Sequence, residues 1–334
     1  MYELLGISLV LAALLTINAF ASLIIAAGWR LLKGATKNLS AGTRANLLFT
    51  LRVSPPALAI ICVAALLVPS FLTYEPYSTA EVVSKKLGAL ALVSAIGVAF
   101  ALWRGARSWW ATRTLLKRWL AIAAPMELAR VNIPTFRIPH PFPIIAVVGS
   151  WTPRLFIAGQ VLRELSEDEL SAAIAHECGH LAARDNLKRS LLRACRDALM
   201  IVPCGRSLDR AWAETAECAA DEHAAQKSPA TALELASALV KIARMIPAGA
   251  HAAVPVAAFL VGNEEARGVK ARVSRLLEIA SNGGLRHVTH STHTKVLSLA
   301  SLGLLFAVGV LAASSSQVLV TVHSLIEHTV RILS

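Results

Sequence analysis

Residues 175–181 read AHECGHL, with two histidines four positions apart and a glutamate directly after the first. Successive residues of an α-helix are rotated by about 100°, so His176 and His180 would lie about 40° apart on one face and could bind one Zn²⁺. Glu177 is adjacent to that face, where it could take a proton from the attacking water. This HExxH pattern predicts a metallohydrolase with Glu177 as its catalytic residue.

The residues before the motif predict that it lies on a helix. Ser166 and Glu169 have the spacing of a capping box, and the acidic residues between them favour a helix N-terminus. Leu170, Ile174 and Leu181 continue as an apolar stripe with helical period. A glycine inside a helix is unfavourable, so Gly179 predicts that another backbone packs closely beside the second histidine.

A third zinc ligand is expected on a second helix, in the alanine-rich segment around Glu217. Glu217 and Asp221 share a helical face; we expect Glu217 to bind the metal and Asp221 to accept the outer N–H of a ligating histidine. Asp185 follows the zinc helix, where it has either this orienting role or a capping role. Three protein ligands and one water make an open, catalytic zinc site, with one Zn²⁺ per chain.

These residues carry a resemblance to two groups of membrane peptidases. The segments TPRLFI (152–157), LSEDEL (165–170), HECGHL (176–181) and ECAADE (217–222) resemble the BlaR/MecR-type antirepressor zinc metallopeptidases. The sequence is also similar to HtpX and CAAX-prenyl endopeptidases, which use HExxH followed by a Glu-x-x-Ala-Asp helix. Both resemblances imply a gluzincin-type zinc endopeptidase in a bacterial plasma membrane.

The composition is that of a membrane protein, with 55% hydrophobic and only 16% charged residues. Four uncharged stretches are long enough to be transmembrane helices. A cleaved signal peptide is the alternative for the first stretch, but no basic residue precedes it. Prolines 55, 56 and 69 are expected to mark the ends of the second. The expected spans are residues 4–28, 53–74, 87–103 and 296–322.

Basic residues follow the first and third spans, so the positive-inside rule places these segments in the cytoplasm and both termini outside. We therefore expect a three-helix membrane region over 1–103, a cytoplasmic zinc metallopeptidase domain over 104–295, a fourth span, and a short external tail over 323–334. The fold class is a mainly α membrane protein with an α+β gluzincin-like domain. With only this short tail expected after the fourth span, we do not expect the antirepressor family's large external sensor.

The net charge of +12 is explained by the basic residues that flank the apolar spans, so we expect contact with the lipid bilayer and no direct binding of nucleic acid.

Segments 142–149 and 155–158 are expected strands. The stretch Ile145, Ala146, Val147, Val148, Gly149 is either a strand that receives substrate by edge pairing or an ordinary core strand. Residues 267–279 predict an amphipathic helix that packs on the domain or on lipid headgroups.

The expected reaction is hydrolysis of a peptide bond in a protein substrate. The antirepressor resemblance implies regulatory cleavage of a cytoplasmic DNA-binding repressor, and the HtpX resemblance implies quality control of membrane proteins. A membrane signalling or scaffold protein with a structural metal is the non-enzymatic alternative. Glu177 argues against it, because a structural site has no use for a general base.

Overall fold

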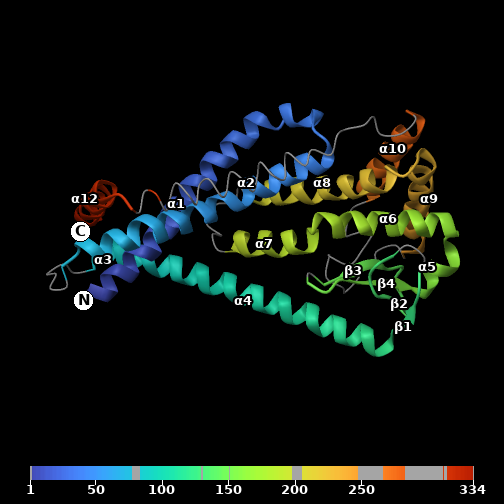
Figure 1. Ribbon diagram of the computed structural model, residues 1–334, viewed down its shortest axis with the longest axis horizontal. Coiled ribbons are helices and arrows are strands. Elements are labelled where there is room, and N and C mark those ends of the chain that lie inside the picture. The colour runs from blue at the N-terminus through green and yellow to red at the C-terminus, as the bar shows by residue number, and fades with distance from the viewer. Residues whose placement is uncertain are drawn as a thin grey trace.

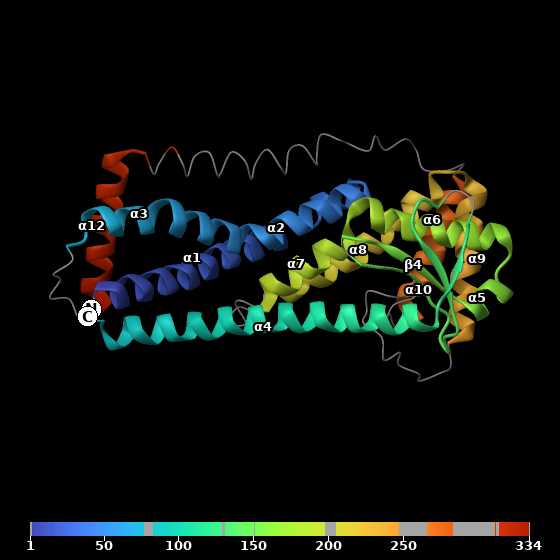
Figure 2. The same cartoon turned by 60° about the horizontal axis from the view of Figure 1, so that its bottom comes forward.

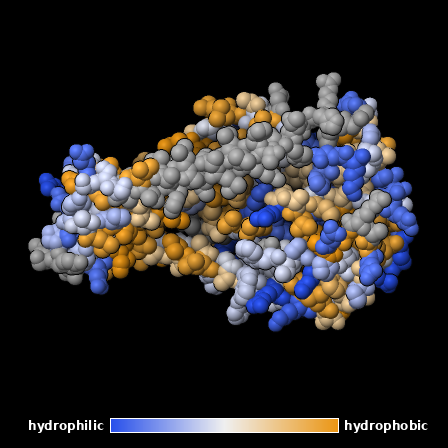
Figure 3. All heavy atoms as spheres, viewed as in Figure 1, coloured by the Kyte–Doolittle hydropathy of each residue, from blue (hydrophilic) through white to orange (hydrophobic). Residues whose placement is uncertain are grey.

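The computed structural model is elongated, with long helices at its narrow end and a small sheet surrounded by shorter helices at its wide end (Figure 1). Hydrophobic side chains dominate the narrow part, and hydrophilic ones are frequent over the wide part (Figure 3). The structure describes residues 2–76, 83–128, 131–149, 151–197, 205–246, 266–282, 311 and 314–333.

Three helical runs are long and apolar enough to cross a membrane. They are α1 (Tyr2–Leu32), the run Ala41–Tyr74, and α4 (Lys85–Ile122); the middle run consists of α2 (Ala41–Cys62), a π-helical turn (Val63–Leu67) and α3 (Val68–Tyr74). A short 3₁₀ helix (Ala35–Asn38) lies between the first two. The first three expected spans are therefore confirmed as helices of sufficient length, in a multi-pass arrangement.

Their boundaries differ from the expected ones. Pro55 and Pro56 lie inside α2 and do not mark its end. Neighbouring helices can satisfy the backbone groups that a proline leaves unpaired, so proline is a weak boundary signal in a membrane helix. The stretch 87–103 is only the first part of α4, which continues to Ile122. The arginines and tryptophans that follow residue 103 do not interrupt a helix, so the helix can extend beyond the apolar stretch.

The expected fourth span lies mostly outside the described residues, which leave out 283–310. Its last residues belong to α12 (Ser316–Leu333), which follows a turn at Ser314, so residues 323–333 are helical where a tail was expected. Ser70 donates a hydrogen bond to Leu319 O at 2.8 Å, and α12 lies at the same end of the molecule as the N-terminus (Figure 2). Both termini therefore lie at one end.

The wide end contains a four-stranded sheet with the order β1-β2-β4-β3. β2 and β4 are parallel, whereas the other two pairs are antiparallel. The two expected strands are confirmed as β3 and β4, with β3 at the sheet edge, while β1 and β2 were not expected. The strands are β1 (Ala124–Met126), β2 (Thr135–Ile138), β3 (Ile145–Val148) and β4 (Arg154–Ala158).

In the described part of the chain, six helices lie between the sheet and α12 in sequence. The central one, α6, packs against β3, α8 and α9, and its small residues Ala172, Ala173 and Ala175 are buried beside Phe156 and Leu239 in one core. Their bounds are α5 (Gly159–Glu164), α6 (Glu167–Ala183), α7 (Asp185–Asp197), α8 (Gly205–Ala225), α9 (Pro229–Met245) and α10 (Ala266–Ser281).

The long helices and the sheet domain are joined by packing between α2 and α8. Leu48 of α2 and Trp212 of α8 are buried in the same cluster as Trp29 of α1. The backbone N–H of Ala41 donates to Glu222 Oε2 at 3.1 Å, at the N-terminus of α2. The helix that carries the expected third ligand is thus attached to an apolar helix of membrane-spanning length.

Candidate metal centre

The two motif histidines lie on α6, as expected. The capping box is present: the Ser166 hydroxyl accepts from Glu169 N–H, and the Glu169 carboxylate accepts from Ser166 N–H at 2.8 Å. The helix ends at Arg184, which has a left-handed conformation (φ 54°), and α7 begins at Asp185. This break between the two helices places Asp185 beside the last turn of α6, with its Oδ2 2.8 Å from His180 Nδ1.

His176, His180 and Glu217 converge on one point. One potential ligand atom from each lies within 4.8 Å of the others, and Glu217 is presented by α8. His176 Nε2 is 3.6 Å from Glu217 Oε2, and His180 Nε2 is 3.5 Å from Glu217 Oε1. Among the described residues this is the one such group, and it is the predicted ligand set.

The donor atoms of this cluster fit Zn²⁺. His176 is fully buried, and its Nε2 has no hydrogen-bond partner among the described residues. An orphaned buried imidazole nitrogen is unfavourable unless a ligand completes it. Two imidazole nitrogens and one carboxylate are the donor set of a catalytic zinc site that keeps a fourth position open.

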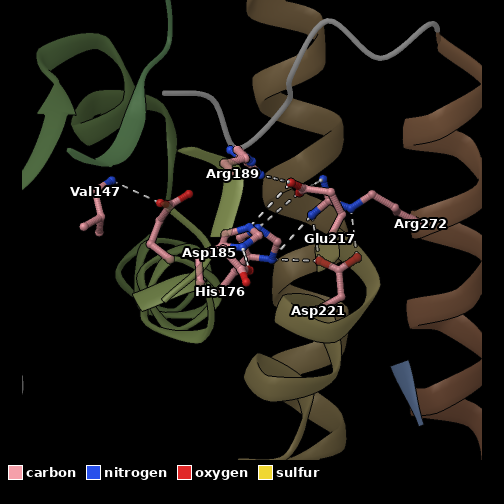
Figure 4. Close-up of polar contacts among 9 residues, drawn as sticks. Val147, His176, Asp185, Arg189, Glu217, Asp221 and Arg272 are labelled. Atoms are coloured by element: carbon pink, nitrogen blue, oxygen red, sulfur yellow. Dashed lines mark hydrogen bonds and ion pairs between the residues drawn. The ribbon is translucent and has the colours of Figure 1, made fainter. Parts of the chain in front are cut away.

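The outer nitrogen of each histidine faces a carboxylate. His176 Nδ1 is 2.9 Å from Asp221 Oδ1, and His180 Nδ1 is 2.8 Å from Asp185 Oδ2. A carboxylate in this position holds the proton on Nδ1 and leaves the Nε2 lone pair directed at the centre of the cluster. Figure 4 shows His176 facing both Glu217 and Asp221, which extend from the same helix.

Arg272 of α10 forms the far wall of the cluster. Its Nε and Nη2 donate to the two Asp221 oxygens at 2.8 and 2.7 Å, and its Nη1 is 3.2 Å from Glu217 Oε2. The segment 267–279, expected as an amphipathic helix, is α10; it packs on α9 and α8 with Arg272 buried. Arg189 of α7 approaches Glu217 from another side, at 3.4 Å (Figure 4).

These charges determine the ionisation of the site. Burial would raise the pKa of Asp221, but Arg272 outweighs it and lowers this pKa to about 2. Burial likewise opposes ionisation of Glu217, yet His180, His176 and Arg272 hold its pKa well below the usual value. Burial would lower the pKa of His180, whereas Glu217 and Asp185 raise it to about 10. Without a metal ion, the Glu217 and Asp221 carboxylates are therefore ionised and His180 is protonated, and a cation bound here would replace the proton on His180 Nε2.

Glu177 points from α6 towards the sheet edge and not towards α8. Its Oε2 accepts the backbone N–H of Val147 in β3 at 3.2 Å, and its side chain is buried. Burial is the largest influence on its pKa, which is raised above the usual glutamate value. Figure 4 shows this contact between the zinc helix and β3.

The expected strand Ile145–Gly149 lies beside the cluster, and Asn186 of α7 donates hydrogen bonds to two of its residues. Asn186 Nδ2 donates to Val147 O at 2.9 Å and approaches Gly149 O at 3.4 Å. Val147 therefore has both edge-facing backbone groups engaged, one by Glu177 and one by Asn186. The N–H and C=O of Val147 face away from β4, as they would to receive another strand.

Close packing at Gly179 is confirmed. A Cβ atom at this position would lie 3.0 Å from Ala220 Cα and 3.1 Å from His223 Cβ. The glycine thus allows α8 to approach α6 at the turn that carries His180, which brings Glu217 within reach of both histidines.

The sequence interpretation missed Arg272, Arg189 and Asn186 at this site. Arg272 is distant in sequence from the motif and lies within the segment 267–279, which predicts only an amphipathic helix. The remaining expected residues, His176, His180, Glu177, Glu217, Asp221, Asp185 and Ile145–Gly149, are all brought together.

Comparison with known proteins agrees with this geometry. Residues 146–296 match the model of peptidase family M48, over a range that contains the motif, Glu217, Asp221 and Arg272. No curated protein and no solved structure gives a significant match to the chain. Together with the His-His-Glu cluster, the match identifies residues 146–296 as a zinc metalloendopeptidase domain of family M48 in a chain with membrane-spanning helices.

Proposed function

We propose that Glu177 is the general base of a peptide-bond hydrolysis carried out at the His176–His180–Glu217 centre. The observation that supports this best is a buried carboxylate next to both histidines and in contact with an edge strand. Bound Zn²⁺ would polarise the scissile carbonyl and lower the pKa of the attacking water. Glu177 would take the water's proton and deliver it to the leaving amine.

The neighbouring residues support this assignment through their contacts. The raised pKa of Glu177 makes the carboxylate a stronger base than an exposed glutamate. Asp221 and Asp185 would each hold a histidine in the tautomer that a metal requires. Arg272 would keep Asp221 ionised and fixed in position.

The substrate is proposed to lie along the outer edge of β3, beside Ile145, Ala146, Val147, Val148 and Gly149. The position of β3 at the sheet edge supports this, because its free side can pair with an extended chain. Asn186 and Glu177 occupy the edge-facing groups of Val147. A substrate strand paired at this residue would have to replace the Asn186 amide at its C=O and the Glu177 carboxylate at its N–H.

The protein substrates are proposed to be cleaved at the cytoplasmic face, given the basic residues that follow α1 and the apolar part of α4. The M48 match favours quality-control cleavage of membrane proteins, the function implied by the HtpX resemblance. Regulatory cleavage of a cytoplasmic DNA-binding repressor is the second candidate. It is supported by the resemblance of residues 152–186 to the antirepressor peptidases.

The test compares Glu177→Gln with Glu167→Gln, a substitution of an exposed glutamate in the first turn of the same helix. We expect wild type and Glu167→Gln to cleave unfolded membrane proteins in a chelator-sensitive way. Glu177→Gln should retain zinc but lose cleavage, and it should hold uncleaved substrate that can be identified. Unchanged cleavage by Glu177→Gln would refute its role as base, and zinc without cleavage in wild type would favour a structural metal site.

A further inference from the structure

A cavity of about 830 Å³ lies between α4, α7 and the turn that follows β3. Figures 1 and 2 show α7 alongside the second half of α4. Four arginines line it, three from α4 and one from α7, and none of its lining residues in the described part of the chain is acidic. We call this cavity the basic groove; its arginines are Arg104, Arg107, Arg113 and Arg193.

The arginines of the groove alternate with exposed tryptophans. The Arg107 guanidinium lies 5.4 Å from the ring centroid of Trp103, and that of Arg113 lies 4.7 Å from Trp109. Trp151, on the turn after β3, lines the groove and is 88% exposed. Stacking on an indole orients a guanidinium while its N–H groups stay available for an anion.

The groove begins where the apolar part of α4 ends. Residues 87–103 carry no charge, and Arg104 is the first basic residue after them. If this part of α4 crosses the bilayer, Trp103 and the arginines of the next turns lie at the depth of the lipid headgroups. Tryptophan and arginine are the residues that such an interface favours.

We propose that the basic groove binds the headgroup of an anionic phospholipid. Its net positive lining suits a phosphodiester, which the planar guanidinium groups can bind through paired N–H donors. The continuity of the groove with the apolar surface of α4 provides a place for the acyl chains. An acidic peptide would match the charge but would not account for exposed tryptophans at the end of an apolar helix.

A lipid bound in this place would contact the protease domain near its edge strand. Gly149, the residue after β3, lines the groove, and so does Leu187, which follows Asn186 on α7. The headgroup would therefore hold the domain against the membrane surface beside β3. This binding does not depend on the proposed proteolytic function.

The experiment measures retention of phosphatidylglycerol by the full-length protein, extracted from membranes into mild detergent, by native mass spectrometry. The variant Arg107→Gln/Arg113→Gln removes two charges from the groove. Lys117→Gln/Arg118→Gln removes two charges from exposed positions of the same helix that do not line the groove. Arg107→Lys/Arg113→Lys keeps the charges, and zinc content serves as the check that the domain remains folded.

We expect the groove variant to bind phosphatidylglycerol about thirtyfold more weakly than wild type, since each lost charge accounts for a factor of about five. The control variant should bind as wild type does, and the lysine variant should bind much better than the glutamine variant. Equal losses in groove and control variants would overturn the proposal, as would unchanged binding in the groove variant. Displacement of the lipid by a soluble polyglutamate peptide as effectively as by added phosphatidylglycerol would also overturn it, in favour of a peptide site.

Discussion

Arg52 of α2 and Asp209 of α8 form a largely buried ion pair in which Arg52 Nε donates to Asp209 Oδ1 at 3.0 Å. The pair lies between a helix of membrane-spanning length and the helix that carries Glu217. Because α8 supplies the third metal ligand, the geometry of the site depends on the attachment of α8 to α2.

The first prediction concerns this ion pair. Removing one partner of a buried pair leaves an uncompensated charge, so Arg52→Met should lower the free energy of unfolding by about 3 kcal/mol. A double-mutant cycle that combines Arg52→Met with Asp209→Leu, with stability measured by thermal unfolding in detergent, should give a coupling energy of about 1–3 kcal/mol. Strictly additive effects would show that the two side chains do not interact.

The second prediction concerns Arg272, which contacts both Asp221 and Glu217. Arg272→Met should weaken zinc binding by about 10–100-fold, because it releases the carboxylate that orients His176. Competition with a chromogenic chelator measures this affinity directly. Lys270→Met removes an exposed charge from the same helix and should leave the zinc affinity unchanged. Equal zinc affinities for wild type, Arg272→Met and Lys270→Met would contradict the role assigned to Arg272.

The third prediction concerns the contact between α6 and α8. Gly179→Ala adds a Cβ that meets the backbone at Ala220, so α8 must shift. We expect the free energy of unfolding to fall by about 1–3 kcal/mol, although alanine has the higher helix propensity. Gly105→Ala is the matched control, because nothing lies within 4 Å of its added Cβ. Thermal unfolding should show a lower midpoint for the first variant only; a rise in both would mean that α8 has room to move.

The fourth prediction concerns Glu169, whose carboxylate accepts from Ser166 N–H, Ser237 Oγ and Lys241 Nζ. Burial would raise the pKa of Glu169, but these contacts outweigh it and lower the pKa. A lowered pKa in the folded state stabilises the protein at pH values above the unfolded value, and the contribution is lost as pH falls through the folded value. Glu169→Gln should therefore lower the free energy of unfolding by about 1–3 kcal/mol at neutral pH.

The pH dependence provides the check. The difference in unfolding midpoint between wild type and Glu169→Gln should be constant near neutral pH and should shrink as the pH falls below about 4. A difference that stays the same in acid would mean that ionisation of Glu169 contributes nothing. Glu167→Gln, in the same helical turn but exposed, should show no such trend.

The zinc helix and its ligands were predictable because the signals are local. The Ser166 capping box fixes where α6 begins, and helical period then places His176 and His180 on one face. Glu217 and Asp221 repeat that spacing on α8. The close approach at Gly179 could be inferred from the unfavourable energy of a glycine inside a helix.

Other features depend on contacts between distant segments. Arg272 has the sequence environment of a solvent-facing residue on an amphipathic helix, and only tertiary packing turns it towards Asp221. Asn186 follows a helix end, where capping is the ordinary role, yet it bonds to Val147 across the sheet edge. β1 has three residues including a proline, and β2 includes an arginine, so neither shows the unbroken aliphatic run that marks β3.

Zinc stoichiometry tests the central claim most directly, namely that His176, His180 and Glu217 bind one metal ion. The measurement is zinc per chain in purified wild type, Glu217→Gln and Glu214→Gln, the last being an exposed glutamate on the same helix. We predict about one zinc per chain for wild type and Glu214→Gln, and a large loss for Glu217→Gln. Zinc retained in full by Glu217→Gln, or absent from wild type, would contradict the account.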